Sequence, residues 1–124
     1  MATKIKWDVY EAVLLIDAYR KIESGEWDRD YAIEKVSSDL RQKAINAGYK
    51  IDDVFRNKNG IAMQLGCIQY AFTDGAKGLR NTSKLFYEAV KIYKSDSTKY
   101  EYLLSEAKKT IYESDNDNMG IETK

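Results

Sequence analysis

The sequence contains no histidine, no proline and a single cysteine among its 124 residues. Without histidine, the chain lacks the most common general base and metal ligand, and Ser-His-Asp or Cys-His catalysis is impossible. The one cysteine, Cys67, cannot form an intramolecular disulfide, and its apolar neighbours Leu65 and Ile68 indicate a buried thiol. We therefore predict that the chain is not an enzyme and holds no metal or cofactor.

Two groups of carboxylates, Asp52–Asp53 and the set Glu26, Asp28 and Asp30, are the remaining candidates for chemistry. They could hold Mg²⁺ or act as acid and base, or they could be solvated loop charges and residues at a helix N-terminus. Neither group has a spacing that requires a metal site. We therefore interpret both as solvated charges.

Long apolar runs are also missing. The longest is Ala12–Ile16, against the roughly 20 residues of a membrane span. The opening residues, M-A-T-K-I-K-W, do not contain the apolar stretch of a signal peptide. With a single cysteine, these features predict a cytoplasmic protein that does not contact a membrane.

Apolar residues recur at helical spacing in five segments, and no stretch shows the alternation typical of a strand. The predicted helices cover about 7–22, 29–46, 57–72, 83–94 and a fifth segment from Thr98, where Glu101 would complete a capping box. We predict an all-α, compact bundle of about five helices, which could include a helix-turn-helix-like arrangement. The inward positions are Trp7, Leu14, Leu40, Ile61, Leu65, Ile68, Phe86 and Leu103. Residues 1–113 would form the helical domain, and 114–124 a disordered tail or a truncated linker.

The charges are balanced in number but not in position. Twenty basic residues face twenty acidic ones, which by itself does not favour a nucleic-acid partner. Residues 54–94, however, contain seven basic and two acidic residues, giving +5, whereas 1–53 carry 9 − 11 = −2 and 95–124 carry 4 − 7 = −3. A basic block between acidic flanks indicates a surface for an anionic partner.

The basic block contains the side chains that could contact DNA. Cations could bind phosphates, and amide side chains can form paired hydrogen bonds with base edges. The predicted phosphate contacts are Arg56, Lys58, Lys77, Arg80 and Lys84. The candidate base contacts are Asn57, Asn59, Gln64 and Gln69. Alternatively, one of the asparagines caps a helix, Arg56 pairs with an acidic neighbour, and the loop that carries Lys77 and Arg80 is a solvated basic loop.

Residues 55–68 read F-R-N-K-N-G-I-A-M-Q-L-G-C-I, and residues 75–85 read G-A-K-G-L-R-N-T-S-K-L. They resemble a helical module of bacterial HNH-type restriction endonucleases, in which R-N-x-x-G-I/V-x-M-K-L precedes G-x-G-L-x-x-x-S-K. The start W-x-x-x-E-x-x-x-L at Trp7 agrees with this module and also resembles the first helix of Myb/SANT-like domains. The resemblance implies a role in engaging DNA. Gln64 stands where the module has lysine, and HNH chemistry would need a separate nuclease domain or subunit.

The first functional expectation is therefore a non-catalytic module that binds or senses duplex DNA, as an accessory part of a larger restriction or mobile-element protein. The alternative is a protein–protein interaction or oligomerisation module, because aromatic residues are favoured at interfaces. Its surface would consist of the tyrosines Tyr100, Tyr102 and Tyr112.

Overall fold

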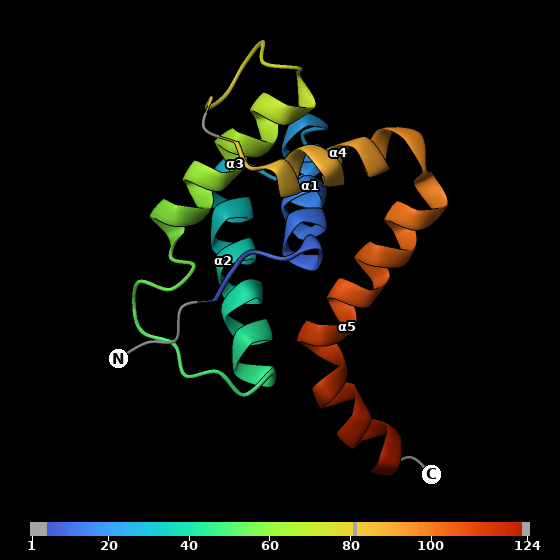
Figure 1. Ribbon diagram of the computed structural model, residues 1–124. Coiled ribbons are helices and arrows are strands. Elements are labelled where there is room, and N and C mark those ends of the chain that lie inside the picture. Colours follow the sequence, from blue (N-terminus) through green and yellow to red (C-terminus); the bar gives the residue numbers. More distant parts are fainter. Residues whose placement is uncertain (1–4, 81, 123–124) are drawn as a thin grey trace.

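The chain folds as five α-helices, as predicted (Figure 1). The computed structural model describes the backbone of residues 5–80 and 82–122, and side chains up to Tyr112. The helices are α1 (Val9–Glu23), α2 (Arg29–Asn46), α3 (Lys58–Phe72), α4 (Lys84–Ser95) and α5 (Ser97–Glu122). No strand occurs within the described residues, and none of their helices is both long and apolar enough to cross a membrane. The predicted all-α bundle is confirmed.

Helix α1 is the centre of the bundle, because it contacts each of the other four helices. Six consecutive residues, 11–16, are buried, so this helix is surrounded by its neighbours on most sides. The predicted core positions Leu14, Leu40, Ile61, Leu65, Ile68, Phe86 and Leu103 are all buried. Trp7, also predicted to be buried, lies before α1 and is half-buried against the core.

The helix starts follow local capping. Asp28 caps α2, as predicted, by accepting a hydrogen bond from the backbone N–H of Tyr31 at 2.8 Å. At α5 the predicted cap was wrong. The helix begins at Ser97, and the Asp96 carboxylate accepts from the N–H of Lys99 at 3.1 Å. Thr98 therefore lies inside the first turn.

Two segments differ from the structure predicted from the sequence. Residues 47–57 join α2 to α3, and this connection is much longer than the turn of about three or four residues in a helix-turn-helix motif. The α2–α3 pair therefore departs from that motif. At the other end, α5 continues to Glu122, through residues predicted to form a disordered tail. No proline interrupts this segment. Residues 123–124 of the predicted tail lie outside the described residues.

Candidate nucleic-acid interface

Arg56, the first predicted phosphate contact, has a buried side chain that is hydrogen-bonded within the domain. Its Nε donates to Glu11 Oε2 at 2.9 Å, and its Nη2 donates to Glu11 Oε1 at 3.1 Å and to the Ile5 carbonyl at 3.2 Å. The guanidinium carbon lies 4.0 Å from the centre of the Trp7 ring. Only 9% of the Arg56 side chain and 4% of the Glu11 side chain are exposed. The structure therefore overturns Arg56 as a phosphate contact and favours the alternative, a pair with an acidic neighbour.

The residues after Arg56 divide into a cap and an exposed pair. The Asn57 side chain accepts a hydrogen bond from the N–H of Gly60 at 2.8 Å and is the N-cap of α3. Asn57 is therefore a capping residue, which agrees with the alternative that one asparagine caps a helix. Lys58 and Asn59 are exposed. Lys58 lies 3.8 Å from Glu34, with both side chains about two-thirds exposed at 65% and 68%, so this pair is weak.

The segment between α3 and α4 folds back onto α3. The N–H of Leu79 donates to the carbonyl of Gly66 at 2.9 Å, and the Leu79 side chain fills the space that a Cβ at Gly66 would occupy. Gly78 has a φ of +95°, and a Cβ there would overlap the Gly66 carbonyl oxygen and lie 2.6 Å from the Tyr70 nitrogen. Both glycines thus allow this segment to pack directly on the helix backbone. The close partner of Gly66 is the protein's own loop.

Side-chain hydrogen bonds further fix this segment. The Thr73 hydroxyl donates to the carbonyl of Gln69 at 2.8 Å and accepts from the N–H of Lys77 at 3.0 Å. The Thr82 hydroxyl donates to the carbonyl of Cys67 at 3.0 Å. A loop held in this way presents its exposed side chains from a defined position.

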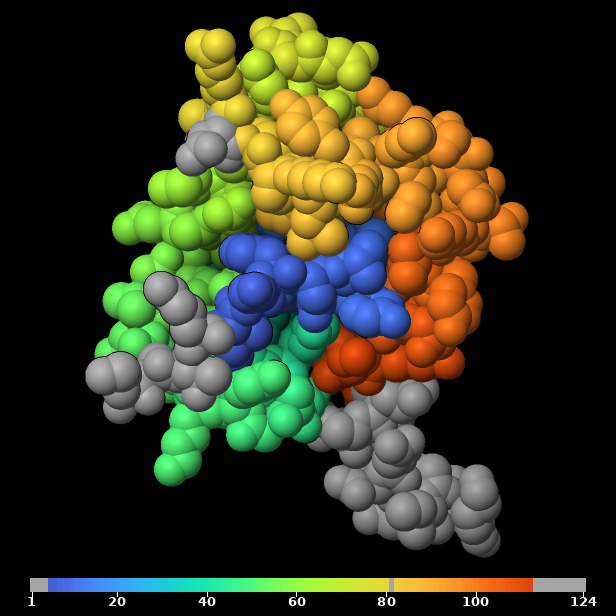
Figure 2. All heavy atoms as spheres, in the orientation of Figure 1, coloured from blue at the N-terminus to red at the C-terminus, as the bar shows by residue number. Residues whose placement is uncertain are grey.

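Three of the predicted phosphate contacts lie on this loop and the helix that follows it. Lys77, Arg80 and Lys84 are exposed. Among the described residues, neither Lys77 nor Arg80 forms an ion pair, and Lys84 has only a distant one, 3.9 Å from Glu88. Figure 2 shows the loop and the start of α4, in yellow and gold, against the green surface of α3 on one face of the molecule. Together with Lys58, they give this face four accessible cations.

The two glutamines of α3 have different surroundings. Gln64 is half-exposed and lines a cavity with Thr82, Ser83 and Trp7. The Gln69 side chain lies near the Tyr19 hydroxyl, and its Cβ would lie 3.1 Å from a Cβ placed at Gly78. Gln69 is thus partly covered by the loop, although it is half-buried to the same degree as Gln64, whereas Asn59 is exposed.

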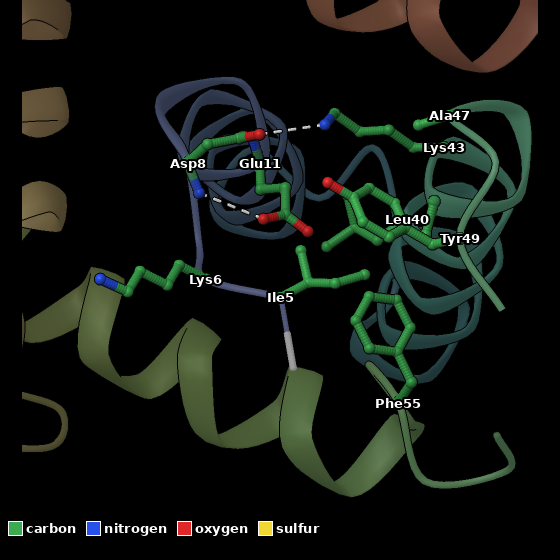
Figure 3. A pocket seen from close by; sticks show the side chains of 10 residues that line it. Ile5, Lys6, Asp8, Glu11, Leu40, Lys43, Ala47, Tyr49 and Phe55 are labelled. Carbon is green, nitrogen blue, oxygen red and sulfur yellow. Dashed lines mark hydrogen bonds and ion pairs between the residues drawn. The ribbon is translucent and has the colours of Figure 1, made fainter. Parts of the chain in front are cut away.

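A second cavity, of about 390 Å³, is lined in part by Glu11 (Figure 3). Its walls come from the N-terminal segment, α2 and the 47–57 connection. Lys43 donates to Asp8 at 3.1 Å across it, and the N–H of Asp8 donates to Glu11 at 3.2 Å. Asp8, Glu11 and Lys43 are thus paired with one another, whereas Lys6, which also lines the cavity, is exposed and forms no ion pair with another described residue.

No group of three or more histidine, cysteine, aspartate or glutamate side chains converges among the described residues as a metal site would require. Cys67 is buried, as predicted, and desolvation by burial raises the pKa of its thiol.

The tyrosines expected to form a protein interface are largely used within the domain. Tyr100 is only 4% exposed, which corrects its assignment to an exposed surface. The Tyr112 hydroxyl accepts from Lys35 at 2.6 Å and donates to Asp39 at 3.0 Å. Tyr102, at 61% exposed, is the most accessible of the three. Of the three predicted interface tyrosines, Tyr102 and Tyr112 are therefore exposed and Tyr100 is not.

The sequence analysis did not detect that Glu11 and Arg56 form a pair. One signal was present: Glu11 lies among apolar residues in the first turn of α1, where a carboxylate requires a partner once it is buried. In the structure, Trp7 and Glu11 both contact Arg56.

No protein-family model, curated protein or solved structure matches this chain.

Proposed function

We propose that this domain binds duplex DNA through one face and has no catalytic activity of its own. The face consists of α3, residues 73–80 and the start of α4. The observation that carries the proposal is the set of accessible cations on this face, Lys58, Lys77, Arg80 and Lys84. Phosphates are the anions that such a set neutralises on DNA.

The arrangement of these cations along α3 supports a polynucleotide ligand over a small anion. Lys58 begins α3, and Lys77 follows its end, so the two lie at opposite ends of a 15-residue helix. A helix of that length extends about 22 Å. Cations separated on this scale can contact several phosphates of a duplex, whereas a single small anion would contact only one of them.

Between the cations, α3 presents polar groups. Asn59 and Gln64 are accessible, and their amides can pair with base edges in a major groove. The weak pairs with Glu34 and Glu88 can be exchanged for phosphates, because solvent-exposed ion pairs contribute little. We further propose that the domain works in the cytoplasm beside a nuclease domain or subunit, which is what the resemblance to the restriction-endonuclease module suggests.

The test is a fluorescence anisotropy titration of a labelled duplex at low salt. We expect a dissociation constant of about 10⁻⁴ to 10⁻⁶ M, the range for non-specific binding. Replacing both Lys77 and Arg80 by alanine removes two phosphate contacts and is expected to weaken binding about tenfold.

The matched control replaces two exposed lysines outside the face, Lys50 and Lys99, by alanine. It changes the net charge by the same amount and is expected to affect binding far less. If the two double variants bind equally, or if the wild type does not bind at high micromolar concentration, the DNA proposal fails. A protein partner would then be sought instead.

A further inference from the structure

A cavity of about 380 Å³ opens beside the proposed DNA-binding face. It is lined by Trp7, Gln64, Thr82, Ser83, Leu85 and Phe86. These residues come from the segment before α1, from α3 and from the start of α4, so the tertiary structure alone creates this space. Its volume is in the range of small-molecule sites, about 300–1,000 Å³.

One polar side chain of this cavity has no hydrogen-bond partner among the described residues. The Thr82 hydroxyl donates to the Cys67 carbonyl at 3.0 Å, and the Ser83 hydroxyl accepts from the N–H of Phe86 at 3.2 Å. The Gln64 amide makes no hydrogen bond to any other residue that the structure describes. A free amide offers a donor and an acceptor side by side, the pattern that pairs with the edge of a nucleobase, adenine above all.

Aromatic rings supply the apolar wall. Trp7 is held by the guanidinium of Arg56, 4.0 Å from its ring centre, and by an edge-to-face contact with Phe86 at 5.9 Å. The indole is therefore fixed in position before a ligand arrives. Nucleobases bind well against rigid aromatic side chains because both are flat and polarisable.

Two lining residues of the cavity are flanked in the sequence by cations. Thr82 and Ser83 lie between Arg80 and Lys84 in the chain, and both cations are exposed. A nucleobase that entered the cavity would still carry its sugar and phosphates, and these would meet the two cations. The cavity, its Gln64 amide, its aromatic wall and the cations that flank Thr82 and Ser83 in the sequence thus correspond to the parts of one nucleotide.

We propose that this cavity accepts an unpaired nucleobase of the bound DNA, with Gln64 contacting the base edge and Arg80 and Lys84 contacting the flanking phosphates. The proposal rests on the proposed DNA binding. It adds a substrate preference that cations alone would not give, namely for a duplex in which one base is already free of its partner. Such a base enters a pocket without the energy needed to break a pair.

The experiment compares three labelled duplexes of one sequence: fully paired, with a single bulged adenine, and with an abasic site in the bulge. We expect the bulged adenine to be bound about tenfold tighter than the paired duplex, from stacking and paired hydrogen bonds. The abasic bulge, which bends the duplex but offers no base, is expected to lose this gain. Gln64→Ala should reduce the ratio of bulged to paired affinity, whereas Gln42→Ala, on the exposed side of α2, should leave it unchanged.

The outcomes separate this inference from the proposed function. Equal affinity for the paired and bulged duplexes would overturn the cavity as a base site while leaving DNA binding intact. Equal affinity for the adenine and abasic bulges would also overturn it, because flexibility would then explain the preference. Displacement of the bulged duplex by an equal concentration of free adenosine monophosphate would overturn it as well, since the ligand would then be a free nucleotide. Failure to bind any of the three duplexes would instead reject the proposed function.

Discussion

The guanidinium of Arg56 and the carboxylate of Glu11 form two parallel hydrogen bonds, at 2.9 and 3.1 Å, beneath the ring of Trp7. This pair connects the first turn of α1 to the residue that precedes the cap of α3. Arg56 adopts a φ of +48°, in the left-handed region that non-glycine residues seldom occupy. The pair and the ring therefore hold the chain in a conformation that it would not adopt by local preference.

Replacing Glu11 with glutamine leaves the Arg56 charge buried without its counter-ion. We expect the free energy of unfolding to fall by about 3 kcal/mol, the usual result of breaking a buried ion pair from one side. Chemical denaturation monitored by circular dichroism measures this. The control, Glu34→Gln, removes a pair that is about two-thirds exposed and is expected to change stability by less than about 1 kcal/mol. Equal effects of the two variants would contradict the structural role of the pair.

The salt dependence of DNA binding reports how many cations take part. Because Arg56 is withdrawn into the core, four predicted phosphate contacts remain: Lys58, Lys77, Arg80 and Lys84. At about −0.9 per neutralised phosphate, the plot of log affinity against log salt should have a slope near −3.6. The Lys77/Arg80 double alanine variant should flatten it by about two. A slope near zero would show that these cations do not contact phosphates.

The position of the loop that carries Lys77 and Arg80 depends on Gly78. A Cβ at Gly78 would collide with the backbone of α3, and φ is also positive there, so Gly78→Ala should move the loop away from the helix. We expect a loss of stability of about 1–3 kcal/mol together with weaker DNA binding. Thermal unfolding and the anisotropy titration measure the two effects.

Gly25→Ala is the matched control for that variant. Gly25 also has a positive φ, +81°, but a Cβ there would meet no atom within 4 Å. The Gly25→Ala variant therefore introduces strain from a positive φ without a collision of the new Cβ. We expect its DNA binding to be unchanged. If Gly25→Ala destabilises the domain as much as Gly78→Ala does, loop packing on α3 is not the cause.

Stability should decline at alkaline pH because of Tyr100. Desolvation by burial, with the nearby Asp17 second, raises the pKa of Tyr100 above its ordinary value of 10.0. In the folded state the Tyr100 phenol thus stays protonated at pH values at which it would ionise in the unfolded chain. The stability that this pKa shift contributes is fully present below pH 10. It is lost as the pH rises from the unfolded pKa to the folded pKa of Tyr100. Tyr100→Phe cannot ionise, so its stability should fall less steeply between pH 9 and about 11. Denaturant midpoints across this range provide the measurement, and identical slopes would contradict the prediction.

The sequence by itself determined the fold class, the approximate helix positions and most of the core. These are local or periodic properties: Asp28 caps the helix that follows it, and Ile61, Leu65 and Ile68 recur at the helical repeat. It also located the basic block, because charge can be counted without a structure.

Only the tertiary structure decided which polar side chains of the basic block are exposed and which are buried or paired. Arg56 and Lys58 are two residues apart, yet one is paired with Glu11 from a distant helix and the other is exposed. Gln64 and Gln69 lie on the same helix, but only Gln69 lies under the loop that returns from residue 78. The pairing of Arg56 depends on a contact with Glu11, 45 residues away in the sequence, and no local pattern encodes which distant segment will supply the partner.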